Sequence, residues 1–149
     1  MGLIDFMVSA GQKLMGNTEE ADDKRQAALT DFVKKMGFEV TDFRLDVKKD
    51  VVTVFGKTKD QETREKIVLA IGNTEGIAKV DDRMEVVTPK PQPQAVYYTV
   101  QKGDTLSGIA KEHYKDAMKY PLIFEANKPM LSDPNKIYPG QVLRIPELD

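Results

Sequence analysis

The chain has 149 residues, of which 40% are hydrophobic and 31% are charged. This composition suits one or two small globular cores and leaves no room for a large enzyme. The formal net charge of −2 argues against a nucleic-acid-binding surface and a basic membrane-binding patch, and the absence of cysteine excludes disulfides and thiolate metal sites.

The first 16 residues read MGLIDFMVSAGQKLMG. Their apolar positions predict a helix over residues 1–16, which is too short to be stable unless it docks on another part of the chain. The segment lacks the basic start of a secretory signal and is too short to cross a bilayer. One Lys and one Asp in this stretch give little support for a helix that lies on a membrane surface. We therefore expect a cytoplasmic protein without a transmembrane segment or membrane association.

Residues 17–88 carry alternating and helical apolar patterns that predict five elements. In chain order these are a helix over 19–36 that ends at Gly37, strands over 43–47 and 51–55, a helix that starts at a Thr58–Gln61 capping box and ends at Gly72 and Asn73, and a strand over 77–86. The order αββαβ predicts helices layered on a three-stranded sheet.

Three stretches of this region carry a family resemblance. They are VVTVFGKTKDQETREKI from Val51, GIAKV from Gly76 and MEVV from Met84. Together they resemble the BON domain, a small module of bacterial proteins associated with osmotic stress and with membrane association. The sequence departs from the family at Asp50, where a glycine is usual in the hairpin. The resemblance covers residues 17–88.

Residues 89–95 read PKPQPQA and contain three prolines without a large apolar residue. Such a segment is typical of an extended, semi-rigid linker, so the chain divides into two domains. A proline-rich ligand motif is the alternative interpretation of the same residues.

Residues 96–149 predict a strand, two helices and a second strand. The pattern comprises Tyr98-x-Val100, Gly103-Asp104-Thr105-Leu106, Ile109-Ala110, Tyr114, Asn127, Ile137-x-Pro139-Gly140-Gln141 and Leu143-x-Ile145-Pro146. It resembles the lysin-motif (LysM) domain over the whole module. The expected fold is α+β, with a BON-like αββαβ domain followed by a βααβ LysM domain.

The order of apolar segment, BON domain, linker and LysM domain resembles a family of cytoplasmic bacterial potassium-binding proteins. The resemblance implies a non-enzymatic ion sensor or buffer in potassium or osmotic stress, which we expect to be a monomer.

K⁺ is large and weakly hydrated, so neutral backbone carbonyls suit it better than clustered carboxylates. Carbonyls become free at helix ends and glycine turns. If the first segment docks beside the turn at residues 73–77, we expect one K⁺ to contact both and to bring the two domains together. The expected ligands are carbonyls of Met7, Ala10, Glu75, Gly76 and Ile77.

Other functions stay open at this point. LysM domains bind glycans that contain N-acetylglucosamine, and here the corresponding residues are Gly103, Asp104, Thr105, Leu106, Asn127, Met130 and Leu131. Several of them also serve turn and cap geometry. Asp81, Asp82 and Glu85 form a small acidic group that could hold a divalent ion, although charges at the start of a half-exposed strand are usually solvated. His113 is the only histidine and has no activating neighbour in the sequence, so we expect no catalytic activity.

Overall fold

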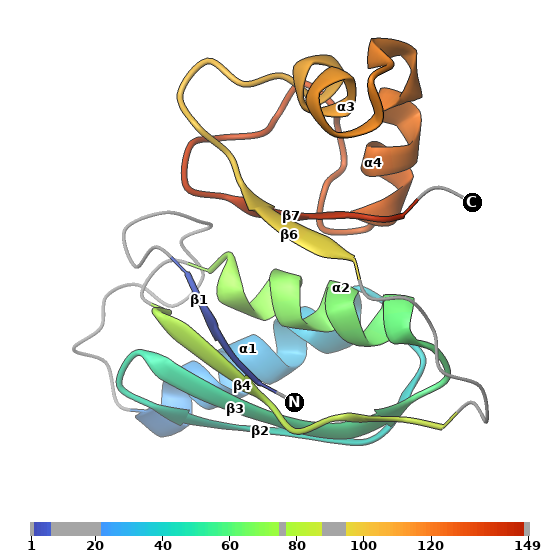
Figure 1. Ribbon diagram of the computed structural model, residues 1–149. Helices are drawn as coiled ribbons and strands as arrows, with labels where there is room; N and C mark the ends of the chain where they lie inside the picture. Colours follow the sequence, from blue (N-terminus) through green and yellow to red (C-terminus); the bar gives the residue numbers. More distant parts are fainter. Residues whose placement is uncertain (1, 7–21, 75–76, 88–94, 148–149) are drawn as a thin grey trace.

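The computed structural model describes residues 2–6, 22–74, 77–87 and 95–147 (Figure 1). The elements are β1 Gly2–Asp5, α1 Asp22–Lys35, β2 Val40–Lys48, β3 Val51–Thr58, α2 Gln61–Gly72, β4 Lys79–Asp82, β5 Glu85–Val86, β6 Val96–Thr99, α3 Leu106–Tyr114, a 3-10 turn Ala117–Lys119, α4 Tyr120–Ala126 and β7 Val142–Ile145. The predicted α+β class is confirmed. Within these described ranges, no helix combines the length and the apolar character needed to cross a membrane.

The first domain, residues 2–87, is a mixed sheet with α1 and α2 on one face (Figure 1). The strand order is β1-β4-β3-β2, and the short β5 pairs with the end of β3. β3 and β4 are parallel, and α2 forms the crossover between them. The predicted αββαβ order is confirmed, except that the single strand expected over 77–86 forms two strands, β4 and β5. With β1 as a further edge strand, the expected three-stranded sheet has five strands.

The predicted helix over residues 1–16 is wrong at its start, because Gly2–Asp5 forms strand β1. Leu3 lies opposite Asp81 and Ile4 opposite Val80 in an antiparallel pair. The unpaired edge of β4 offers these residues backbone hydrogen bonds, and a short apolar run has no helical preference strong enough to compete with them. The remainder of the predicted helix, residues 7–16, lies outside the described residues.

Turn and cap residues fix the ends of the elements in the first domain. α1 is followed by Gly37 at φ 79°, and the β2–β3 hairpin turns through Lys49 at φ 56°. The N-cap of α2 is Asp60, whose side chain accepts a hydrogen bond from the Thr63 N–H at 2.8 Å. The capping box expected to start at Thr58 is therefore wrong by two residues, since the Thr58 hydroxyl donates to the Asp60 carbonyl instead.

The second domain, residues 95–147, pairs β6 with β7 in antiparallel register and packs α3 and α4 on one face of this two-stranded sheet (Figure 1). Thr105 caps α3 by accepting the Gly108 N–H at 3.1 Å. Pro121 lies in the first turn of α4, where its missing N–H costs no hydrogen bond. The predicted βααβ order is confirmed.

The other face of the β6–β7 sheet lies on α2 of the first domain (Figure 1). Val142 of β7 is buried within the apolar cluster of the first domain, and Tyr97 and Met130 pack against the same cluster. α2 is consequently covered on two sides, by its own sheet and by the second domain. All residues from Ile67 to Gly72 are buried.

The end of α2 contacts β1 through Gly72. A Cβ at this position would overlap the ring of Phe6, which is itself buried. Gly72→Ala should therefore lower the free energy of unfolding by about 1–3 kcal/mol, the usual cost of overpacking. Urea denaturation measures this change.

Phe6→Ala provides the control for this prediction. Without the ring, Gly72→Ala should be neutral or should stabilise α2 by up to about 1 kcal/mol, because alanine favours a helix more than glycine does. An equal loss of stability in both backgrounds would contradict the contact.

Candidate functional site

The end of α2 runs into a tightly bonded turn before β4. The Asn73 N–H donates to the Leu69 carbonyl at 2.9 Å, and the buried Thr74 hydroxyl donates to the Ala70 carbonyl at 3.2 Å. The Ile77 N–H donates to the Thr74 carbonyl at 3.2 Å and closes the turn. The last carbonyls of a helix have no partner N–H within the helix, so a turn of this kind concentrates backbone oxygens.

Phe6 brings the first strand to this turn. Its N–H donates to the Ala78 carbonyl at 2.7 Å, and its ring lies against Gly72. The end of the first strand therefore lies beside Gly72 and Ala78. The predicted ligands Met7, Ala10, Glu75 and Gly76 lie outside the described residues. Ile77 lies within them, with a fully buried side chain.

The side chain of Asn73 joins the turn to the second domain. Its Oδ1 accepts the Val142 N–H at 2.8 Å, and its Nδ2 donates to the Val142 carbonyl at 2.8 Å. The hydroxyl of Tyr138 in the second domain donates to the Asn73 carbonyl at 3.4 Å, and burial raises the pKa of this tyrosine to about 12. The Asn73 Nδ2 also donates to the Met130 sulfur at 3.3 Å, so one residue of the first domain bonds Met130, Tyr138 and Val142 of the second.

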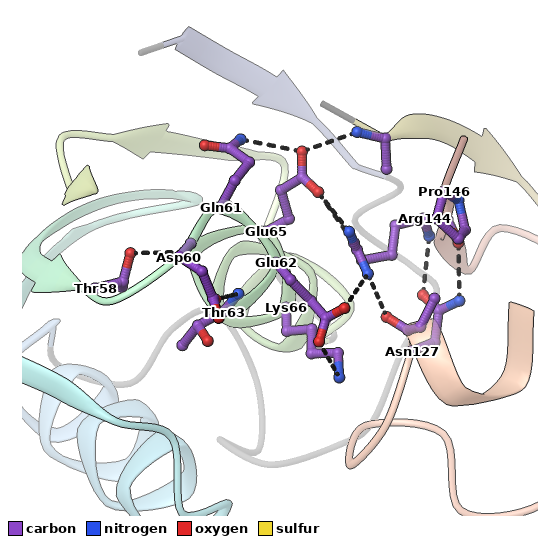
Figure 2. Close-up of polar contacts among 12 residues, drawn as sticks. Thr58, Asp60, Gln61, Glu62, Thr63, Glu65, Lys66, Asn127, Arg144 and Pro146 are labelled. Carbon is purple, nitrogen blue, oxygen red and sulfur yellow. Dashed lines mark hydrogen bonds and ion pairs between the residues drawn. The ribbon is translucent and has the colours of Figure 1, made fainter. Parts of the chain in front are cut away.

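A buried ion pair links the domains nearer the start of α2 (Figure 2). Nε and Nη2 of Arg144 donate to Glu65 Oε1 at 3.1 and 2.9 Å. Glu65 Oε2 accepts the Gln61 side chain and the Ala95 N–H, both at 3.1 Å, while Arg144 Nη1 donates to the Ala126 carbonyl at 3.0 Å. The side chains of Glu65 and Arg144 are only 4% and 5% exposed. Each charge is therefore neutralised and hydrogen-bonded, which makes its burial tolerable.

Tyr97 lies in the same interface. Burial and the neighbouring carboxylate of Glu65 raise the pKa of its hydroxyl well above the usual value for tyrosine. The tyrosine is uncharged at neutral pH and contributes apolar area to the interface.

The predicted glycan residues separate into two groups. Thr105 and Leu106 line a groove of about 130 Å³ together with Ser107, Tyr120, Pro134 and Asn135. Gly103 has φ 89°, and the neighbouring Asp104 accepts the Tyr98 hydroxyl at 2.5 Å, which raises the pKa of Tyr98 to about 12.

The second group of predicted glycan residues faces the protein interior. Asn127 is 2% exposed, and its side chain bonds the Ile123 carbonyl and both backbone groups of Arg144. Leu131 is buried in the core of the second domain, and Met130 packs between the two apolar clusters. These three side chains pack in the interior or bond backbone groups. Of the predicted glycan residues, only members of the first group line the groove.

Two members of the acidic group in the first domain, Asp81 and Asp82, are bound by arginine side chains. Asp82 is buried and accepts Arg64 Nε at 2.8 Å, and Asp81 pairs with Arg83 at 3.0 Å. In the part of the chain that the structure describes, no three His, Asp or Glu side chains are grouped as a metal site. His113 packs edge-on against Tyr98, with ring centres 5.3 Å apart.

Comparison with known proteins supports the two-domain architecture. The BON domain family matches residues 21–88, and the LysM domain family matches residues 98–146. The chain is 46% identical to "Potassium binding protein Kbp" of Escherichia coli O6:H1, over 99% of both chains. The chain belongs to the Kbp family.

Other relatives of this Kbp-family chain share only part of its length. It is 33% identical over 79 residues to the uncharacterized protein YqbP of Bacillus subtilis, covering 46% of this chain and 36% of YqbP. It is 49% identical over 53 residues to the esterase Rv1288 of Mycobacterium tuberculosis, covering 36% of this chain and 11% of the esterase. A match to so small a part of the esterase carries no catalytic activity to this chain.

Sequence reasoning missed Glu65, Asn73 and Arg144 as a group that joins the domains. A signal for it exists in the uninterrupted apolar run from Ile67 to Ile71, because a helix that is apolar all round is buried on more than one side. In β7, the arginine between Leu143 and Ile145 indicates a face directed away from the LysM core. The identity of the opposing element is not contained in either pattern.

The ion pair gives a prediction for stability. Arg144→Met leaves the Glu65 carboxylate buried without its guanidinium, and breaking such a pair costs about 3–5 kcal/mol. Undocking of the LysM domain would return the carboxylate to water, so the loss in unfolding free energy cannot exceed the free energy of docking. Calorimetric unfolding should show a lower melting temperature, together with a separate LysM transition.

The matched variant replaces both partners. Glu65→Met with Arg144→Met removes both charges and keeps similar volume, so most of the lost stability should return. If the double variant loses as much unfolding free energy as Glu65→Met and Arg144→Met lose together, the two charges do not interact.

Proposed function

We propose that this Kbp-family protein is a non-enzymatic potassium-binding protein of the cytoplasm, acting as a monomeric ion sensor or buffer in potassium or osmotic stress. The observation that carries the proposal is the position of Phe6 beside the turn after α2. Its N–H donates to the Ala78 carbonyl and its ring lies on Gly72, so the end of the first strand lies beside the end of α2 and the start of β4. The name of the full-length relative supplies potassium as the ion, and the BON and LysM families are non-catalytic.

We assign the ion to backbone carbonyls of both segments. Neutral carbonyl oxygens suit K⁺, whereas clustered carboxylates favour Ca²⁺ or Mg²⁺. The carboxylates of Asp81 and Asp82, the alternative cation ligands, are engaged by arginines, which supports a site built from the main chain. The proposed ligands are carbonyls of Met7, Ala10, Glu75, Gly76 and Ile77.

Ion binding would change the conformation of more than one domain. An ion shared by the segment after Phe6 and the turn fixes the two relative to each other. The turn begins next to Asn73, which bonds Val142 of the LysM domain. A change in the turn therefore has a direct route to the domain interface.

Glycan binding is a second candidate function, favoured by the groove at Thr105, Leu106 and Tyr120. These residues begin α3 and α4, which lie on the side of the LysM sheet turned away from α2 (Figure 1). The groove thus stays open while the domains are docked, and a glycan would not compete with the interface.

Thermal melting in KCl, NaCl and choline chloride at equal ionic strength tests the ion. A ligand bound only by the native state adds about 2.7 kcal/mol at a hundredfold excess over its Kd. This corresponds to a rise in Tm on the order of 10 °C for a small domain. We expect the rise in KCl alone.

Two results of the same melts would change the proposal. Identical curves in the three salts would refute potassium binding. A rise with soluble N-acetylglucosamine oligomers in choline chloride, without any potassium effect, would favour the glycan function instead.

A further inference from the structure

Asn73 makes a strand-like contact with the LysM domain. Its carboxamide accepts from the Val142 N–H and donates to the Val142 carbonyl, both at 2.8 Å. This is the pair of bonds that a neighbouring strand would supply. Asn73 as a whole residue is 6% exposed, so water does not replace these bonds in the docked protein.

A second asparagine makes the same contact two residues further along β7. Asn127 of the LysM domain accepts the Arg144 N–H at 2.9 Å and donates to the Arg144 carbonyl at 3.0 Å. Val142 and Arg144 both direct their backbone groups away from β6. Arg144 is satisfied from within its own domain, whereas Val142 depends on the BON domain.

The backbone of Asn73 belongs to the turn. Its N–H closes the last turn of α2 on the Leu69 carbonyl, and the next residue, Thr74, accepts the Ile77 N–H. The asparagine side chain has only two rotatable bonds. Its carboxamide reaches Val142 from the observed backbone conformation, φ −83° and ψ 24°, and a rotation of this backbone would carry it away.

We propose that Asn73 is the positioning residue that couples K⁺ binding at the turn after α2, residues 73–77, to docking of the LysM domain. This inference rests on the proposed potassium function. When the turn is held by the ion, Asn73 presents its carboxamide to Val142 and the LysM domain docks. By reciprocity, a docked LysM domain holds Asn73 and raises the affinity of the turn for K⁺ by the same factor.

Two measurements on the full chain test the coupling. Calorimetry gives the affinity for K⁺, and energy transfer between labels gives the docked fraction. The chain has no cysteine, so Lys34→Cys and Met118→Cys, at exposed positions of the two domains, carry the labels. In the otherwise unchanged protein we expect the docked fraction to rise with K⁺ and to be unaffected by Na⁺.

Asn73→Ala should make the docked fraction independent of K⁺ and lower the affinity for K⁺ about tenfold, within the usual range of coupling between sites. Asn73→Asp keeps the size of the side chain and replaces the donor to the Val142 carbonyl and the Met130 sulfur with a carboxylate. Because the added charge can itself attract a cation, only the docked fraction is compared for this variant; it should be independent of K⁺, and it decides the matter if the alanine variant does not fold. Glu65→Gln is the matched control, because it weakens the interface away from the turn. Its docked fraction should be lower and should still rise with K⁺.

The outcomes separate the two claims. If docking of Asn73→Asp follows K⁺ as in the unchanged protein, Asn73 is not the coupling residue. If the unchanged protein binds K⁺ with no change in docking, the coupling is refuted and the proposed function stands. If calorimetry and melting show no K⁺ binding at all, the proposed function fails, and the coupling fails with it.

Discussion

The backbone of β7 imposes the requirement on which the domain arrangement depends. β7 pairs with β6 on one side, and the backbone groups of Val142 and Arg144 point to the other side. Buried N–H and C=O groups need hydrogen-bond partners, since an unpaired group costs about 1–3 kcal/mol. One asparagine from each domain meets this need. The LysM domain is therefore complete as a hydrogen-bonded unit only when it lies on α2 of the BON domain.

α2 connects this requirement to the proposed ion site. Near its start, Glu65 holds Arg144, and at its end Asn73 holds Val142. The same end leads into the turn beside Phe6. Because a helix is stiff along its axis, the ion pair and the asparagine bridge hold the LysM sheet at two points of one rigid element. The ion pair stabilises docking whether or not the turn holds an ion. In the proposed coupling, the bonds between Asn73 and Val142 stabilise docking only when the turn holds Asn73 in the observed conformation.

Much of the fold could be predicted from the sequence, because helical and alternating periods, glycine turns and the LysM pattern are local signals. β1 could not, since its strand conformation is stabilised by pairing with β4, which lies far along the chain. Asn127 illustrates a different difficulty. The family pattern marks its position, yet the structure uses its side chain to close β7. Of the candidate site, chemistry indicates carbonyls near the turn, whereas the contact between Asn73 and Val142 arises only when two separate domains meet.

Amide hydrogen exchange at two residues of β7 measures the coupling most directly. The Val142 N–H bonds Asn73 of the BON domain, and the Arg144 N–H bonds Asn127 of the LysM domain itself. In a comparison of KCl with NaCl at equal ionic strength, we predict that Val142 exchanges much more slowly in KCl, while the rate at Arg144 changes little. Equal rates at Val142 in the two salts, or a parallel change at both residues, would contradict the account.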